Sequence, residues 1–269
     1  MFDEFAGFFL STGLKLFHQF ISRFSLAAAA TYGKVLHSVW KDLSQEASSE
    51  AFVSKIEESL QTWVYQAMHA SNTKTFKSLR ALISAFHSTN RNGALHSMLK
   101  RIYGPILWRS VKCANAIVRA QATILFFDVF PLHDPEGSAE DDDTLLQRQF
   151  DLLTSLLNDS DHTVRLNAVN GTCQILIDYW ESLPVETTNN ILRHLILKLS
   201  TDSSSAAVRA SVFHSLEKLL KQQPLSHAVL KTLIPLTKNA LHDSSEKVRV
   251  AFVKLLIQVP HQIVSSTLL

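Results

Sequence analysis

The sequence predicts an all-α protein in which pairs of helices stack into a solenoid. Glycine and proline are scarce, with 7 of each among 269 residues, which is few for a sheet protein with many tight turns. Apolar residues make up 46% of the chain and recur at helical rather than alternating spacing. A Val-Arg pair occurs four times, at intervals of 46, 44 and 40 residues. A repeat of that length with helical spacing is what stacked helix pairs require.

Each Val-Arg pair lies near the start of a predicted helix, which we call the B helix of a repeat. The pairs are Val118-Arg119, Val164-Arg165, Val208-Arg209 and Val248-Arg249. Four positions after the valines come Ala122, Ala168, Val212 and Phe252, and eight positions after them come Phe126, Thr172, Leu216 and Leu256. Steps of four trace one face of an α-helix, so we expect this face to be buried.

A second apolar segment, the A helix, precedes each B helix at 95–111, 144–157, 187–200 and 226–241. Two helices in a period of about 40 to 47 residues are typical of HEAT repeats, a superhelical stack of antiparallel helix pairs. A weaker unit, without Val-Arg, comes earlier, with an A helix at 50–70 and a B helix at 73–88. Pro105 and Pro235 fall inside A helices, where we expect them to bend the helix rather than end it.

These patterns divide the chain into four expected parts. Residues 1–48 form a helical segment that does not fit the repeat, and its Phe-rich start predicts an amphipathic helix rather than a signal peptide. Residues 49–130 form HEAT-like repeats with a basic surface, residues 131–143 form a flexible acidic loop, and residues 144–269 form further HEAT repeats. We expect the repeats to continue beyond the end of this sequence.

The turn between the A and B helices carries an aspartate in three repeats. Asp159, Asp202 and Asp243 stand five or six positions before the valine, where they could cap the B helices. Arg165, Arg209 and Arg249 recur once per repeat, as a ladder between stacked repeats requires. A catalytic acid–base pair would not be built several times at this period, so we interpret these six residues as structural.

Charge is distributed unevenly, although the net charge is only +2. No Asp or Glu occurs from Ser59 to Phe127, a stretch that carries nine Lys and Arg. Solvated helical faces mix both signs, so this stretch predicts a positive surface for the phosphates of double-stranded DNA, bound without sequence readout. The candidate phosphate contacts are Lys74, Lys77, Arg80, Lys100, Arg101, Arg109 and Lys112. A basic surface that has no ligand, or that meets an acidic protein, is the alternative.

No motif in the sequence indicates catalysis or metal binding. We find no Gly-rich phosphate loop, no HExxH motif and no Cys/His pairs at zinc spacing. Cys113 and Cys173 lie in apolar helical stretches, as reduced thiols do. We therefore expect no catalytic residue, cofactor, metal, small-molecule substrate or membrane span.

Residues 95–135 and 151–184, which include "NAIVRAQATILFF" and "HTVRLNAVNGTCQIL", resemble the G-type HEAT-repeat subunits of condensin II. The resemblance covers about residues 47–269 and leaves 1–45 unassigned. It implies a non-catalytic subunit in the nucleus, on chromosomes, that acts in mitotic chromosome condensation and segregation. As partners it implies double-stranded DNA, a kleisin and, through the kleisin, an SMC ATPase heterodimer.

The competing interpretation is a scaffold that binds only proteins. Transport receptors and phosphatase scaffolds are also HEAT arrays, and such a protein would make no DNA contact. The acid-free stretch favours the DNA-binding interpretation.

Overall fold

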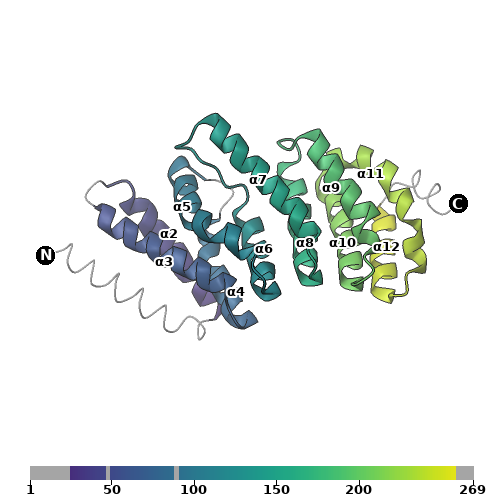
Figure 1. Cartoon of the computed structure of the whole chain (residues 1–269), viewed down its shortest axis with the longest axis horizontal. Coiled ribbons are helices and arrows are strands. Elements are labelled where there is room, and N and C mark those ends of the chain that lie inside the picture. The colour runs from purple at the N-terminus through teal and green to yellow at the C-terminus, as the bar shows by residue number, and fades with distance from the viewer. Residues whose placement is uncertain (1–24, 47–48, 88–90, 259–269) are drawn as a thin grey trace. The chain divides into compact units, whose positions relative to one another are not determined.

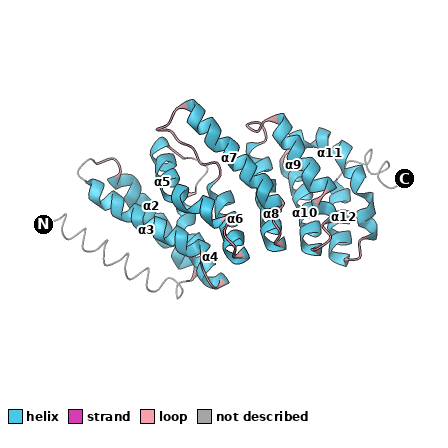
Figure 2. Ribbon diagram, viewed as in Figure 1, coloured by secondary structure: helices cyan, strands magenta, loops and turns pink. Residues whose placement is uncertain are grey.

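The computed structural model describes residues 25–46, 49–87 and 91–258 (Figure 1). Every regular element within these ranges is a helix, as Figure 2 shows, which confirms the predicted all-α solenoid class. The chain divides into two compact units, Met1–Leu146 and Gln147–Leu269, and each is described by itself. The amphipathic helix expected at the Phe-rich start lies outside the described residues.

Unit 1 contains the two helix pairs that the sequence predicts over 50–88 and 95–129. Its helices are α2 (Leu26–Leu43), α3 (Glu50–Met68), α4 (Thr73–Ile83) with a 3-10 turn at Ser84–Phe86, α5 (Gly93–Ser110), α6 (Ala116–Val129) and the start of α7 (Ala139–Leu157). Helix α3 packs against its partner α4 and against both α5 and α6. The A and B helices of neighbouring repeats therefore share one core.

Helix α2 packs mainly on α4, the B helix of the next pair. A Cβ atom added to Gly33 would lie 2.0 Å from the carbonyl oxygen of Leu82, so the two backbones approach closely at this glycine. At the other end of α2, Nε1 of Trp40 donates to Glu57 of α3 over 3.1 Å. Helix α2 belongs to the segment 1–48, which did not fit the repeat. It thus occupies the position that the B helix of a preceding repeat would have.

Unit 2 contains three B helices, each packed on the next. Its elements are the rest of α7, α8 (His162–Tyr179), α9 (Val185–Leu197) with a 3-10 turn at Leu199–Thr201, α10 (Ala206–Gln222), a 3-10 turn at Pro224–Ser226, α11 (His227–Leu233), a 3-10 helix at Ile234–His242, and α12 (Glu246–Gln258). Helix α10 packs on both α8 and α12.

The repeated apolar face is buried, as its spacing predicts. Val164, Val208 and Val248 have no exposed surface, and the residues four positions later, Ala168, Val212 and Phe252, have none either. Each large apolar side chain buried in this way contributes about 1.5 to 3 kcal/mol through the hydrophobic effect. The Val-Arg repeat therefore indicates, above all, which face of each B helix packs in the core.

The two prolines act differently from each other. Pro105 lies inside α5, which stays continuous. Pro235 follows the end of α11, and the chain continues as a 3-10 helix from Ile234 to His242, so the α-helix predicted over 226–241 is only partly α-helical. Proline lacks the N–H that an α-helical turn needs, and its ring crowds the preceding turn.

The acidic segment 131–143 is not all loop, which corrects the sequence-based boundary. Helix α7 begins at Ala139, and three acids stand in its first turn. The hydroxyl of Ser138 donates to Asp141 over 2.7 Å, and the backbone N–H of Asp141 donates back to that hydroxyl over 3.1 Å. Carboxylates are favourable near the positive end of a helix, so the same residues that suggested a solvated loop start a helix.

Candidate functional site

Arg80, one of the predicted phosphate contacts, has a partner within unit 1. It lies in the last turn of α4, and its Nε and Nη2 donate to the two carboxylate oxygens of Asp128 over 2.6 and 2.7 Å. These hydrogen bonds are the main cause of the raised pKa of Arg80. Because Asp128 stands near the end of α6, the pair joins α4 to α6, and the charge of Arg80 is already balanced.

Lys100 and Arg101, both on α5, are paired too. Lys100 forms an ion pair with Asp134, and Nη2 of Arg101 donates to Glu57 over 2.9 Å. Arg101 also lies 3.9 Å from the exposed carboxylate of Glu136. In the sequence, these acids lie just outside the acid-free stretch. In the folded chain, they contact basic side chains of that stretch.

Four predicted contacts stay exposed. Lys74 and Lys77 are on the first two turns of α4, Arg109 is in the last turn of α5, and Lys112 is in the turn that follows. Among the described residues, no carboxylate lies within ion-pair distance of any of them. The N-terminal end of α4 adds its own positive potential to that of Lys74.

These four cations lie at one end of the helix pairs. The side chain of Gln121, in the second turn of α6, donates to the carbonyl of Ala70 in the turn before α4, over 3.0 Å. The turn that starts α4 and the turn that starts α6 are therefore at the same end of unit 1. The Arg80–Asp128 pair joins α4 and α6 at their opposite ends. We call Lys74, Lys77, Arg109 and Lys112 the exposed basic end.

The remaining two basic residues of the acid-free stretch bind backbone carbonyls. Nη1 of Arg91 donates to the carbonyls of Val129 and Pro131 over 2.7 and 3.0 Å. Nη1 of Arg119 donates to two carbonyls in the turn before α6, over 2.9 Å each. Both side chains donate to backbone carbonyls that have no hydrogen-bond partner within a helix, which is a structural role.

A half-buried histidine of unit 1, His87, was not among the residues predicted from the sequence. Nε2 of His87 lies 2.8 Å from the hydroxyl of Tyr103. Burial lowers the pKa of His87 to about 4, with Arg91 and Arg80 adding to the decrease and Asp128 opposing it. The ring is therefore neutral near pH 7. No sequence motif marks this pair, because His87 follows the 3-10 turn after α4 and Tyr103 is on α5.

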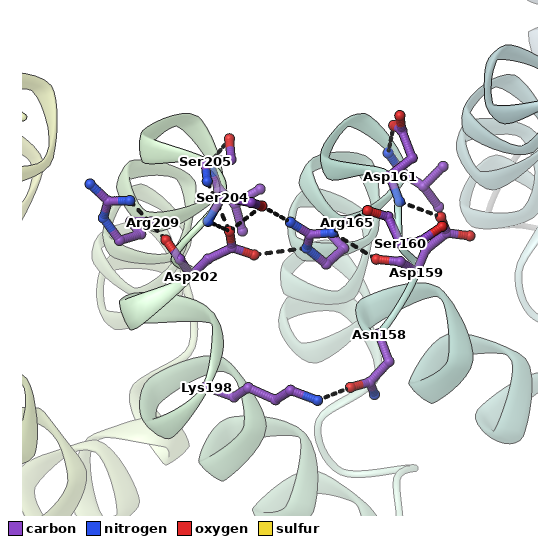
Figure 3. A network of polar contacts seen from close by, with 12 residues as sticks. Asn158, Asp159, Ser160, Asp161, Arg165, Lys198, Asp202, Ser204, Ser205 and Arg209 are labelled. Carbon is purple, nitrogen blue, oxygen red and sulfur yellow. Dashed lines mark hydrogen bonds and ion pairs between the residues drawn. The ribbon is translucent and has the colours of Figure 1, made fainter.

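Arg165, the arginine of the first repeat of unit 2, connects two turns, as Figure 3 shows. Nη1 of Arg165 donates to the carbonyls of Asp159 and Ser160, in its own turn, over 2.7 and 3.0 Å. Its Nε donates to the carboxylate of Asp202, in the next turn, over 2.8 Å, and its Nη2 donates to Ser204. One guanidinium thus ties its own A–B turn to that of the following repeat.

The contact repeats one unit later. Nη1 of Arg209 donates to the carbonyl of Asp202 over 2.8 Å, and its Nε and Nη2 donate to the carboxylate of Asp243 over 2.7 and 2.8 Å. Nη1 of Arg249 donates to the carbonyl of Asp243 over 2.7 Å. The six residues of the predicted ladder are brought together in this order within unit 2.

The ladder aspartates do not cap the B helices, which corrects the sequence-based role. Asp161 caps α8, and Ser205 caps α10. Asp159, Asp202 and Asp243 each accept a backbone N–H two residues ahead, over 2.8 to 2.9 Å, so they shape the turn before the cap. A carboxylate has more than one acceptor oxygen, which leaves room for the arginine of the preceding repeat.

Two further features are absent from the described residues. These residues contain no group of three or more His, Cys, Asp or Glu side chains arranged to hold a metal ion. Within the same residues, no helix has both the length and the apolar character to cross a membrane.

Stacked helix pairs joined by arginine–aspartate contacts define a HEAT-type repeat protein. Comparison with known proteins gives the family. A model of the condensin II non structural maintenance of chromosomes subunit matches residues 1–134, and a model of the sister chromatid cohesion protein PDS5 matches residues 142–269. The chain belongs to the family of condensin II G2 subunits. The match from residue 1 also extends the likeness over 1–45, which the sequence reasoning left unassigned.

The curated relatives agree on this family. The condensin-2 complex subunit G2 of Danio rerio is 43% identical over 188 residues, which are 70% of this chain and 16% of the relative. The Xenopus laevis protein is 38% identical over 221 residues, 82% of this chain and 19% of the relative. The Homo sapiens protein is 36% identical over 228 residues, 84% of this chain and 20% of the relative. The chain thus spans a fifth or less of the length of these relatives.

Proposed function

We propose that the chain is a non-catalytic, DNA-binding and kleisin-binding regulatory part of a condensin II complex. In this role it acts in mitotic chromosome condensation and segregation, in the nucleus and on chromosomes. Its partners are double-stranded DNA, a kleisin and, through the kleisin, the SMC ATPase heterodimer. Membership of the condensin II G2 family supports the complex as a whole.

The observation that carries the DNA-binding part is the exposed basic end. Lys74, Lys77, Arg109 and Lys112 are solvent-exposed and lack a described carboxylate partner, so phosphates would not have to displace an internal ion pair. Cations that contact only phosphates bind duplex DNA without reading its sequence. Arg80, Lys100 and Arg101 would each have to give up a carboxylate first, so we assign them a smaller part in the contact.

Charge reversal tests this assignment. The variant Lys74→Glu/Lys77→Glu/Arg109→Glu should lose most of its affinity for a random-sequence duplex at about 0.1 M salt, because each reversal removes a phosphate contact and adds repulsion. The matched control is Lys231→Glu/Lys238→Glu/Lys247→Glu, which makes the same change of net charge at exposed positions of unit 2. Equal loss in the two variants would contradict a localised DNA site.

One observation favours the competing scaffold function. Three of the seven predicted phosphate contacts are engaged with carboxylates of unit 1, which is how a surface without a polyanionic ligand would be balanced. If the unmodified chain does not bind the duplex at about 0.1 M salt, with the kleisin present or absent, the scaffold interpretation replaces DNA binding.

The kleisin part of the proposal rests on family membership and needs its own test. We expect the chain to co-purify with a co-expressed condensin II kleisin through an affinity tag on the kleisin. The triple Lys/Arg→Glu variant should co-purify equally well, since the exposed basic end is assigned to DNA. Failure of the unmodified chain to co-purify would contradict kleisin binding by this segment.

A further inference from the structure

Tyr65, on α3, carries an aromatic ring that the fold does not bury. Its exposed fraction is 50%, and among the described residues it is the only Phe, Trp or Tyr that is exposed rather than half-buried or buried. The ring contacts that of His69, one helical turn later, with ring centroids 4.4 Å apart and ring planes tilted by 32°. His69 is exposed as well, so the two rings form an aromatic surface in contact with water.

Helix α5 lies beside α3, and its register brings Arg109 close to this ring pair. Nε2 of Gln61, on α3, donates to the carbonyls of Arg101 and Ile102 over 3.5 Å each. Both helices end at the turns that precede α4 and α6, which lie at the same end of unit 1, so the two helices run in the same direction. Eight positions further along each helix come His69 and Arg109, both exposed. The ring pair is therefore level with a cation of the exposed basic end.

The other cations of the exposed basic end belong to the same end of the helices. Lys112 is in the turn after α5, and Lys74 and Lys77 are on the first two turns of α4, which begins four residues after His69. Proteins that bind single-stranded nucleic acids combine these two components, since cations contact the phosphates and aromatic rings stack on unpaired bases. In a duplex, the faces of the bases are covered by their neighbours.

We propose that the ring of Tyr65 stacks on unpaired bases of single-stranded DNA whose phosphates contact the exposed basic end. This inference rests on the proposed DNA-binding function and adds to it a preference for bases that are not paired. His69 is a positioning residue, because its ring holds that of Tyr65 from one side. Stacking on a ring reads no sequence, which agrees with a phosphate contact that reads none.

A second copy of the chain fits this surface less well. A two-fold contact centred on Tyr65 would bring Arg109 and Lys112 of one copy close to the same cations of the other. Among the described residues, no carboxylate lies within ion-pair distance of either cation, so their charges would repel across the contact. A DNA strand supplies both the missing negative charge and a flat partner for the ring.

The test compares two single strands that differ only in their bases. One is an oligonucleotide of about 15 thymidines, and the other is a strand of the same length without bases, so both carry the same phosphates. Fluorescence anisotropy measures the affinity of the full chain for each labelled strand at about 0.1 M salt. We expect the thymidine strand to bind about tenfold more tightly, which is the range that stacking on one aromatic side chain supplies.

Three variants separate stacking from charge. Tyr65→Ala should reduce the preference for the thymidine strand to about one, whereas Tyr65→Phe should keep it, because a phenyl ring also stacks. Lys77→Ala should weaken binding to both strands by the same factor, since it removes only a phosphate contact. Tyr65→Ala should leave the salt dependence of binding unchanged, and Lys77→Ala should reduce it. Because Tyr65 is exposed, helical circular dichroism should be the same in all three variants.

Two results would overturn the stacking role while DNA binding itself stands. They are equal affinity of the unmodified chain for the two strands, and a preference for bases that persists in Tyr65→Ala. If the chain binds neither the single strands nor a duplex, the proposed DNA-binding function fails together with this inference. Self-association of the unmodified chain in sedimentation velocity, abolished by Tyr65→Ala, would assign the ring to a second copy instead.

Discussion

Arg165 and Asp202 form an ion pair of 2.8 Å between α8 and the turn before α10, although they stand 37 positions apart in the sequence. Their side chains are only 10% and 7% exposed. Arg165 also holds two carbonyls of its own turn. The pair therefore fixes the distance between consecutive turns, so both residues are part of the interface between stacked repeats.

Loss of this contact should destabilise unit 2 more than loss of a helix cap would. We expect Arg165→Ala to lower the free energy of unfolding by about 3 kcal/mol, because it leaves the Asp202 carboxylate buried without its partner. Arg249→Ala, which removes only bonds to the turn carbonyls, should cost about 1 kcal/mol and is the matched control. Urea titration of both variants, followed by helical circular dichroism, measures the difference. Equal losses would contradict the stacking role.

Asp243 makes the stability of unit 2 depend on acid pH. The hydrogen bond from Arg209 is the main reason that the pKa of Asp243 lies below its ordinary value of 3.8, against the opposing effect of burial. Because the pKa of Asp243 is lower in the folded state, the stabilisation that its carboxylate provides is complete above the pKa of the unfolded state. This stabilisation is lost as pH falls through the pKa of the folded state. Unfolding midpoints in urea from about pH 6 to pH 3 should therefore fall less steeply for Asp243→Asn than for the unmodified chain. Parallel curves would show that Asp243 is not responsible.

His87 should produce a pH dependence in unit 1 at higher pH. Its pKa of about 4 lies below the ordinary value of 6.5 mainly because partial removal from water disfavours the charged form of the ring. The unfolded chain then binds the proton more readily than the fold does, so stability decreases as pH falls from about 7 towards 4. In His87→Gln this decrease should be smaller, as measured by thermal unfolding at several pH values. A variant with the unchanged slope would assign the effect to other groups.

Gly33 and Gly104 offer a matched pair for the packing of unit 1. Gly33→Ala would place a methyl group 2.0 Å from the carbonyl oxygen of Leu82, so α2 and α4 must separate. We expect a loss of about 1 to 3 kcal/mol, as overpacking causes. Gly104→Ala meets no atom within 4 Å and lies inside α5, so the higher helix propensity of alanine should leave stability unchanged or raise it slightly. Thermal unfolding of both variants checks the contrast.

The helices were predictable from the sequence because the signal is local. Valines at 164, 208 and 248 with apolar residues four positions later identify buried helical faces without any knowledge of neighbours. The length of the repeat then gives two helices per unit. The role of the turn aspartates was predicted only in part, since a capping position and the position before it are hard to separate from spacing alone. Asp161 and Ser205 carry the caps, and both are common capping residues.

The charge pattern shows why the candidate site was harder to predict. A stretch without acids in the sequence is not a surface without acids in space, because carboxylates at its borders can fold back. Asp128 reaches Arg80, and Glu57 reaches Arg101, from positions just outside the stretch. The acids at both borders were a visible signal for such pairing. Among the described residues, the four cations of the exposed basic end have no such carboxylate partner. The seven candidate phosphate contacts are therefore reduced to four.

The salt dependence of DNA binding tests the central claim most directly. The slope of the logarithm of the association constant against the logarithm of salt concentration reports the number of phosphates neutralised, at about 0.9 per contact. Four contacts predict a slope of about −3 to −4 for the unmodified chain, and Lys74→Ala/Lys77→Ala/Arg109→Ala should reduce its magnitude by about 3. The same slope in this variant and in the unmodified chain would contradict DNA binding through the exposed basic end.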